Sequence, residues 1–235
     1  MAKPKLALIP ATQGSKLYSV LPADGVGDFD FSRGSAATRI NKDGLIETVA
    51  SGVSRLNYPL IDGVVNGCPS HLLEPSRSNL ISYSEDLSQW TLTNITLTPN
   101  SLISPSGLLN ADKISSSSLG VDVKLESITV SSNTIYTYSF YCYYVEGETL
   151  QGRFYDNTNG TNIEYYDYME QIEQSKWKRV TRTFTTPIGC TNIQVWLLAS
   201  STTFPVIVYY WGAQLEQGSY PTSYIPNYGT SAGIT

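Results

Sequence analysis

The chain has 235 residues, only 15% of them charged, and its 15 basic and 20 acidic side chains give a formal net charge of −5. This length accommodates one large domain with a smaller extension. Because charged residues are few, the surface of the protein must consist largely of Ser, Thr, Asn and Tyr. No basic cluster exceeds the short run from Lys176 to Arg179, which argues against a nucleic-acid-binding protein. No apolar stretch approaches the about 20 residues of a transmembrane helix, and the N-terminal apolar run is too short for a signal peptide.

The first 75 residues predict a small, loop-rich region of β-hairpins. Asp43 and Gly44 lie between the runs Ala37–Ile40 and Leu45–Val49, which is a hairpin signal. A second turn is expected at Asp62 and Gly63. Such a region buries little apolar surface by itself, so we expect it to pack on a partner chain or another protein.

Strand signals then recur at short, regular spacing and predict an all-β, antiparallel β-sandwich. Helical periodicity is nearly absent, and the best helix candidate is the short run Met169–Gln174. The predicted strands are Asp122–Val130, Tyr136–Val145, Leu150–Tyr155, Ile163–Tyr168, Trp177–Phe184, Ile193–Leu198 and Val206–Leu215.

Alternation within these strands predicts which side chains face the core. In the second strand the predicted core face carries Tyr136, Tyr138, Phe140, Cys142 and Tyr144, and the opposite face carries Thr137, Ser139, Tyr141 and Tyr143. In the sixth strand, Ile193, Val195 and Leu197 oppose Gln194, Trp196 and Leu198. In the last strand, strict alternation places Ile207, Tyr209, Trp211, Ala213 and Leu215 on one face, opposite Val206, Val208 and Tyr210.

The residues do not suggest an enzyme. A nucleophile and base pair would have to use His71, the single histidine, which lies in a linker-like segment. The carboxylate pairs that could hydrolyse a glycoside fall mostly in turns or strand ends, where solvated acids are ordinary: Glu85/Asp86, Glu146/Glu148 and Glu164/Asp167. The cysteines lack metal-ligand spacing and are expected to be free, buried thiols of a protein made in a reducing cytoplasm: Cys68, Cys142 and Cys190.

Several blocks resemble known protein families. Phe29–Glu47, Cys68–Trp90 and Tyr209–Pro226 are similar, in the same order, to segments of bacteriophage virion proteins of the head-fibre, tail-fibre and decoration type. Ser106–Ile114, Tyr136–Phe140 and Trp177–Phe184 are similar to the jelly-roll carbohydrate-binding modules that accompany polysaccharide hydrolases.

The resemblance implies a jelly roll over residues 76–220, an attachment and oligomerisation region over 1–75 and a tail over 221–235. It implies a non-enzymatic structural protein on the virion surface, made in the host cytoplasm, often a homotrimer, that binds a capsid or tail protein through its N-terminal region. Because the chain stops nine residues beyond Pro226, we expect a short head fibre or decoration protein. The alternative is a carbohydrate-binding adhesin, or a tail-fibre or adaptor module, that binds surface polysaccharide.

Glycan binding would rest on exposed aromatic rings, because the apolar face of a sugar stacks on them while amides and charged groups read its hydroxyls. We select Tyr141, Tyr143 and Trp196 as an aromatic face, with Arg153 and Gln194 as polar partners; Tyr155, Tyr165 and Tyr166 are further candidates. A neighbouring subunit would cover such a face equally well. The carbohydrate modules often hold a structural calcium ion, for which Asp156, Asn157 and Glu216 are weak candidates, although Asp156 and Asn157 are more typical of a turn.

Overall fold

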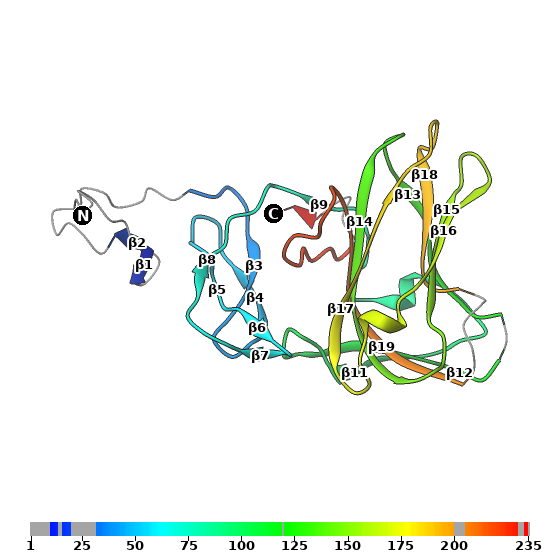
Figure 1. Cartoon of the computed structure of the whole chain (residues 1–235), viewed down its shortest axis with the longest axis horizontal. Coiled ribbons are helices and arrows are strands. Elements are labelled where there is room, and N and C mark those ends of the chain that lie inside the picture. The colour runs from blue at the N-terminus through cyan, green and yellow to red at the C-terminus, as the bar shows by residue number, and fades with distance from the viewer. Residues whose placement is uncertain are drawn as a thin grey trace, which may run out of the picture. The chain divides into compact units, whose positions relative to one another are not determined.

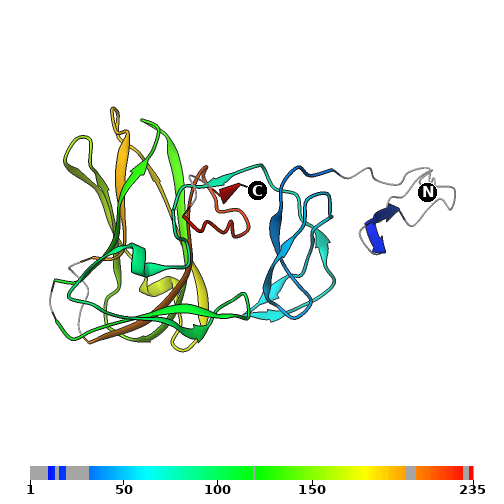
Figure 2. The ribbon, with the colours of Figure 1, turned by 180° about the vertical axis from the view of Figure 1, so that it is seen from behind.

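A computed structural model describes residues 10–13, 16–19, 32–118, 120–199, 205–229 and 233–234. These residues fall into two compact units, one ending at Pro75 and the other running from Ser76 to Ile234 (Figures 1 and 2). Over these ranges the chain contains no helix that is long and apolar enough to cross a bilayer.

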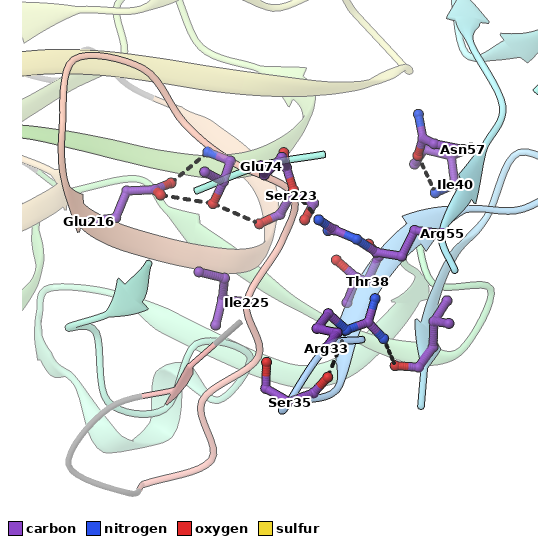
Figure 3. Close-up of polar contacts among 12 residues, drawn as sticks. Arg33, Ser35, Thr38, Ile40, Arg55, Asn57, Glu74, Glu216, Ser223 and Ile225 are labelled. Carbon is purple, nitrogen blue, oxygen red and sulfur yellow. Dashed lines mark hydrogen bonds and ion pairs between the residues drawn. The ribbon is translucent and has the colours of Figure 1, made fainter. Parts of the chain in front are cut away.

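The first unit consists of short antiparallel strand pairs. They are β1 (Pro10–Gln13) with β2 (Lys16–Ser19), β3 (Ala37–Ile40) with β4 (Ile46–Val49), β5 (Leu56–Asn57) with β8 (Ser70–His71), and β6 (Leu60–Ile61) with β7 (Val64–Val65). Both predicted turns are confirmed. Asp62 and Gly63 have φ values of 50° and 79°, as a tight hairpin turn requires. Figure 3 shows some of the polar contacts of this unit, among them Ile40 N donating to Asn57 Oδ1.

The second unit is a jelly-roll sandwich of two five-stranded antiparallel sheets, which face each other in Figures 1 and 2. One sheet, called here the β18 sheet, has the order β10 (Thr91–Thr93), β13 (Asp122–Thr129), β18 (Asn192–Leu198), β15 (Gln151–Asp156) and β16 (Thr161–Asp167). The other, the β14 sheet, has the order β11 (Thr96–Ile103), β12 (Leu109–Ser116), β19 (Val206–Gln217), β14 (Ile135–Glu146) and β17 (Trp177–Thr185). Two short 3-10 helices, η1 (Leu87–Gln89) and η2 (Met169–Gln171), and a pair formed by β9 (Ser78–Asn79) and β20 (Gly233–Ile234) complete it.

All seven predicted strands of the sandwich are present, with ends that differ by one or two residues. The sequence missed β10, β11 and β12; β10 has only three residues, and β11 is a largely exposed edge strand that contains Pro99 and Asn100. The predicted helix at Met169–Gln174 is only the single turn η2.

Aromatic side chains fill the space between the two sheets. The rings of Phe154 and Phe184 are stacked with centroids 4.0 Å apart. The hydroxyls of Tyr168 and Tyr210 lie 2.5 Å apart, and Tyr168 Oη also donates to Leu197 O at 2.8 Å. Burial raises the pKa of both tyrosines well above its ordinary value. These contacts keep the phenol groups neutral and hydrogen-bonded inside an apolar core.

The predicted core face of β14 is confirmed, since Tyr136, Tyr138, Phe140 and Cys142 are all buried and Tyr144 packs against the core. The cysteine prediction is correct for Cys142 and Cys190, which are free and buried, and wrong for Cys68, which is free but exposed.

Strict alternation in β19 was a wrong expectation. Gly212 has a φ of 66° and forms a bulge, so the register against β14 passes from Tyr141 opposite Trp211 to Ser139 opposite Gln214. Val206, Val208 and Tyr210 point into the core before the bulge, and Ala213 and Leu215 after it. Tyr209 and Trp211 therefore lie on the outer face of the β14 sheet, opposite to the face that carries Ala213 and Leu215.

Candidate functional site

The C-terminal segment 222–227 covers part of the outer face of the β14 sheet. Thr222 donates to the buried Glu216 carboxylate from both its backbone N and its Oγ1, each at 2.8 Å, and Figure 3 shows this contact. Ile225 N donates to Gln214 Oε1 at 2.7 Å. The Tyr224 ring packs on Trp211 with centroids 4.4 Å apart. Trp211 is thus buried by the chain itself and offers no ring face to a ligand.

The remaining part of this face carries two of the predicted glycan residues, Tyr141 and Tyr143. The Tyr143 ring contacts Trp177 at 5.6 Å and Tyr209 edge-on at 5.8 Å, and the Tyr141 ring contacts Trp211 at 5.5 Å. All of these rings are half-buried or buried. They shield one another, so this face resembles a packed aromatic surface more than an open platform.

The outer face of the β18 sheet has a different composition, in which aromatic and cationic side chains alternate across neighbouring strands. The register places Lys124 of β13 opposite Trp196 of β18, Trp196 opposite Arg153 of β15, and Arg153 opposite Tyr165 of β16. These four residues form one row across the sheet, called here the cross-strand row. In the neighbouring position Gln194 lies opposite Tyr155.

Arg153 is the centre of this face. Its guanidinium carbon lies 4.6 Å from the ring centre of Tyr155, 5.1 Å from that of Tyr165 and 4.5 Å from that of Trp196. Its Nε donates to Asn162 Oδ1 at 2.6 Å. Within the described part of the chain it forms no ion pair and no other hydrogen bond. The rings and the amide therefore hold a planar cation without neutralising it.

The second cation of the row, Lys124, does have an anionic partner. Its Nζ lies 5.2 Å from the Trp196 ring centre and 3.2 Å from Glu126 Oε1. Hydrogen bonds from Lys124 and Thr91 lower the pKa of Glu126, which keeps this carboxylate charged. The uncompensated positive charge of the face is therefore that of Arg153.

The prediction that Tyr141, Tyr143 and Trp196 share one face is wrong. The two tyrosines lie on the β14 sheet, whereas Trp196, Arg153 and Gln194 lie together on the β18 sheet. Alternation told us correctly that each side chain points away from the core. It could not reveal which sheet each strand joins, because strand order is set by the tertiary fold.

Trp196 is also unsuited to be the predicted sugar platform. It is only 3% exposed, because the cations of Lys124 and Arg153 lie over its ring. Tyr165 is 45% exposed, more than any other aromatic residue that the structure describes on a strand of the sandwich. Its neighbour Tyr166, another candidate, points inward and is buried. The open ring of this face is Tyr165, with Tyr155 beside it on β15.

The weak calcium candidates do not come together. Asp156 ends β15 of the β18 sheet and Asn157 follows it, whereas Glu216 lies in β19 of the β14 sheet. Asp156 accepts hydrogen bonds from Thr158 N, Asn159 N and Asn159 Nδ2. Burial raises its pKa, but these bonds outweigh burial and lower it overall. Asp156 therefore closes a turn, and the described residues contain no cluster of three His, Cys, Asp or Glu side chains suited to a metal ion.

Residues 86–201 match the family described as a carbohydrate binding domain. The sandwich has the fold of a carbohydrate-binding module. The matched range covers just under half of the chain and includes all five strands of the β18 sheet, whereas β19 lies outside it.

Solved structures similar to this chain include tailspike protein 4 of bacteriophage CBA120, at 15% identity and a TM-score of 0.44, where the match covers 60% of this chain and 21% of the tailspike chain. The N-terminal cellulose-binding domain of Cellulomonas fimi β-1,4-glucanase C matches at 13% identity and a TM-score of 0.44, over 59% of this chain and 95% of that domain. A Bacteroides thetaiotaomicron protein matches at 14% identity and a TM-score of 0.44, over 60% of this chain and 100% of that one. The curated proteins contain no match to this sequence.

Proposed function

We propose that the protein binds glycan through the outer face of the β18 sheet, without catalysis and without a resident cofactor. Tyr165 is the stacking platform, Tyr155 extends it, and Arg153 and Gln194 bind the polar groups of the sugar. The observation that carries this proposal is the exposed Tyr165 ring, which adjoins an uncompensated guanidinium on a sheet face within the matched module.

The chemistry of the face suits a sugar. A pyranose ring is apolar on its C–H faces and rich in hydroxyls at its rim, so it binds where a ring face and hydrogen-bonding groups lie side by side. The rings of Tyr165 and Tyr155 flank Arg153, and the amide of Gln194 lies opposite Tyr155. The face therefore offers stacking and directional donors together.

A glycan array probed with the full chain tests the proposal. We expect retention of at least one glycan, lost on Tyr165→Ala and kept on Tyr143→Ala, a matched change on the outer face of the β14 sheet. Because aromatic stacking contributes about 1 kcal/mol or more, the loss should reach roughly 5-fold or more in affinity. If the chain retains no glycan, or if only Tyr143→Ala abolishes binding, the proposed site is wrong.

We further propose that the chain is a structural component of a phage particle, most simply a short head fibre or decoration protein on the virion surface, made in the host cytoplasm. Residues 1–75 would attach it to a capsid or tail protein and hold a homotrimer. The support for this is the order of the sequence blocks Phe29–Glu47, Cys68–Trp90 and Tyr209–Pro226, which resemble phage virion proteins.

Light scattering of the full chain and antibody labelling of particles test this second proposal. A trimer mass and label at the particle surface are the expected results. A monomer at high concentration that still binds glycan, with unlabelled particles, would instead favour the alternative, a carbohydrate-binding adhesin or tail-fibre adaptor module.

A further inference from the structure

We infer that the ligand of the β18 sheet is an acidic glycan, whose carboxylate binds the guanidinium of Arg153. This inference rests on the proposed function and narrows it to sugars that carry a carboxylate, such as uronic or sialic acids. It depends on the surroundings of Arg153, whose η nitrogens have neither the carboxylate partner of Arg39, Arg55 and Arg182 nor the carbonyl acceptors of Arg33 and Arg179.

Three other arginines have carboxylate partners. Arg39 pairs with Glu47 at 2.7 Å, Arg55 with Glu74 at 2.8 Å, and Arg182 with Glu164. Arg153 has none within the described residues, although it lies in a chain with an excess of acidic side chains. Three aromatic rings and one amide take the place of a carboxylate around this guanidinium, and they leave its positive charge free for an external anion.

The surroundings of Arg153 orient the guanidinium for an external anion. The three rings of Tyr155, Tyr165 and Trp196 restrict its position, and the bond from Nε to Asn162 fixes one edge of its plane. The N–H groups of both η nitrogens have no acceptor within the described chain. Two parallel N–H groups match the two oxygens of a carboxylate, and their geometry is set before the ligand arrives.

A second donor on the same face also lacks an acceptor. The indole Nε1–H of Trp196 is buried and has no hydrogen-bond partner among the described residues. Of the two cations over its ring, Lys124 is paired with Glu126 and Arg153 has no carboxylate partner among the described residues. Because the Trp196 indole is buried, the donors of this row that a ligand can reach are those of Arg153, and their positive charge favours an anionic ligand over a neutral one.

The position of Tyr165 completes the recognition. Its exposed ring lies in register with Arg153 on the adjacent strand, and the guanidinium carbon is 5.1 Å from its centre. A sugar stacked on Tyr165 would therefore place substituents of its ring edge near the η nitrogens. A carboxylate on that sugar would gain charge-assisted hydrogen bonds that a hydroxymethyl group cannot supply in equal strength.

The test compares acidic glycans with the same glycans after reduction of each carboxylate to a primary alcohol. The probes are uronate- and sialate-bearing oligosaccharides in both forms, together with sulfated and neutral oligosaccharides, titrated into the full chain. We expect carboxyl reduction to weaken binding by about 10-fold or more. Arg153→Gln should erase this difference, and Arg153→Lys should restore part of it, because a lysine keeps the charge but loses the paired donors.

Thermal unfolding of each variant establishes that it is folded. Asn162→Ala keeps the guanidinium but removes the acceptor that orients it, so it should reduce the preference for the acidic form less than Arg153→Gln does. Equal affinity for acidic and reduced forms, or preference for sulfated or neutral glycans, would overturn the inference. If Tyr165→Ala abolishes the binding of whichever glycan the chain does bind, the proposed glycan site would still stand. If no probe binds at all, the proposed function falls as well, so the two failures are distinguishable.

Discussion

Replacement of Asn79 by Ala should lower the free energy of unfolding of the sandwich by more than the loss of one hydrogen bond does. Asn79 is fully buried, and its side chain joins three segments of the chain. Its Nδ2 donates to Ser84 Oγ at 2.8 Å, to Ala213 O at 3.1 Å and to Ile225 O at 2.8 Å. Its Oδ1 accepts from Ile81 N and Leu215 N, both at 3.0 Å. One side chain therefore links the β9 segment, strand β19 and the C-terminal tail.

The magnitude follows from the groups left without partners. A buried donor or acceptor that loses its partner costs about 1–3 kcal/mol, and the costs overlap where neighbours relax together. For the partners of Asn79 we expect a loss of about 4 kcal/mol in the free energy of unfolding. At about 2–4 °C per kcal/mol for a domain of this size, Tm should fall by roughly 8–16 °C.

Urea unfolding of the full chain, followed by tryptophan fluorescence, measures this loss. Ser84→Ala is the matched control, because it removes one of the same bonds and leaves the others, and it should cost about 1 kcal/mol. A loss for Asn79→Ala no larger than that of Ser84→Ala would refute the view that Asn79 anchors the tail.

Gly152→Ala should also destabilise the sandwich, because an added Cβ would lie 2.2 Å from Cζ of the buried Tyr166 ring. Thermal unfolding followed by circular dichroism should show a lower Tm, and an unchanged Tm would contradict this packing. Asp156 should contribute stability above the ordinary carboxyl pKa and lose it as pH falls through its lowered folded pKa. As the pH is lowered from about 5 to 2, the urea concentration at the unfolding midpoint should therefore fall more steeply for the unmodified chain than for Asp156→Ala. Equal slopes for the two proteins would show that Asp156 is not responsible for this loss of stability.

The architecture of the sandwich could be predicted where strands alternate clearly. Tyr136–Val145 shows its buried face in the sequence, because aromatic residues alternate with Thr137 and Ser139 from Tyr136 to Phe140. Strand β11 could not be predicted, because its exposed edge position allows Pro99 and polar residues that read as loop. The bulge at Gly212 could have been suspected from a glycine inside an apolar strand, but its effect on side-chain direction required the φ value and the register.

The site was predictable only in its residue types. Arg153, Gln194 and Trp196 do lie together, and each points away from the core as alternation indicates. The cover of Trp196 by Arg153 depends on the register between β15 and β18, which pairs residues more than forty positions apart in the chain. Long-range register of this kind is fixed by the packing of the whole fold. For this reason the sequence predicted Trp196 as the exposed stacking ring, whereas in the structure the exposed ring is Tyr165.

The most direct test of glycan binding at the β18 sheet is one affinity comparison, made on the full chain with a glycan that it retains. The account predicts that Tyr165→Ala lowers the affinity by roughly 5-fold or more, while Tyr143→Ala leaves it unchanged. Equal affinities for the unmodified chain and Tyr165→Ala would contradict it.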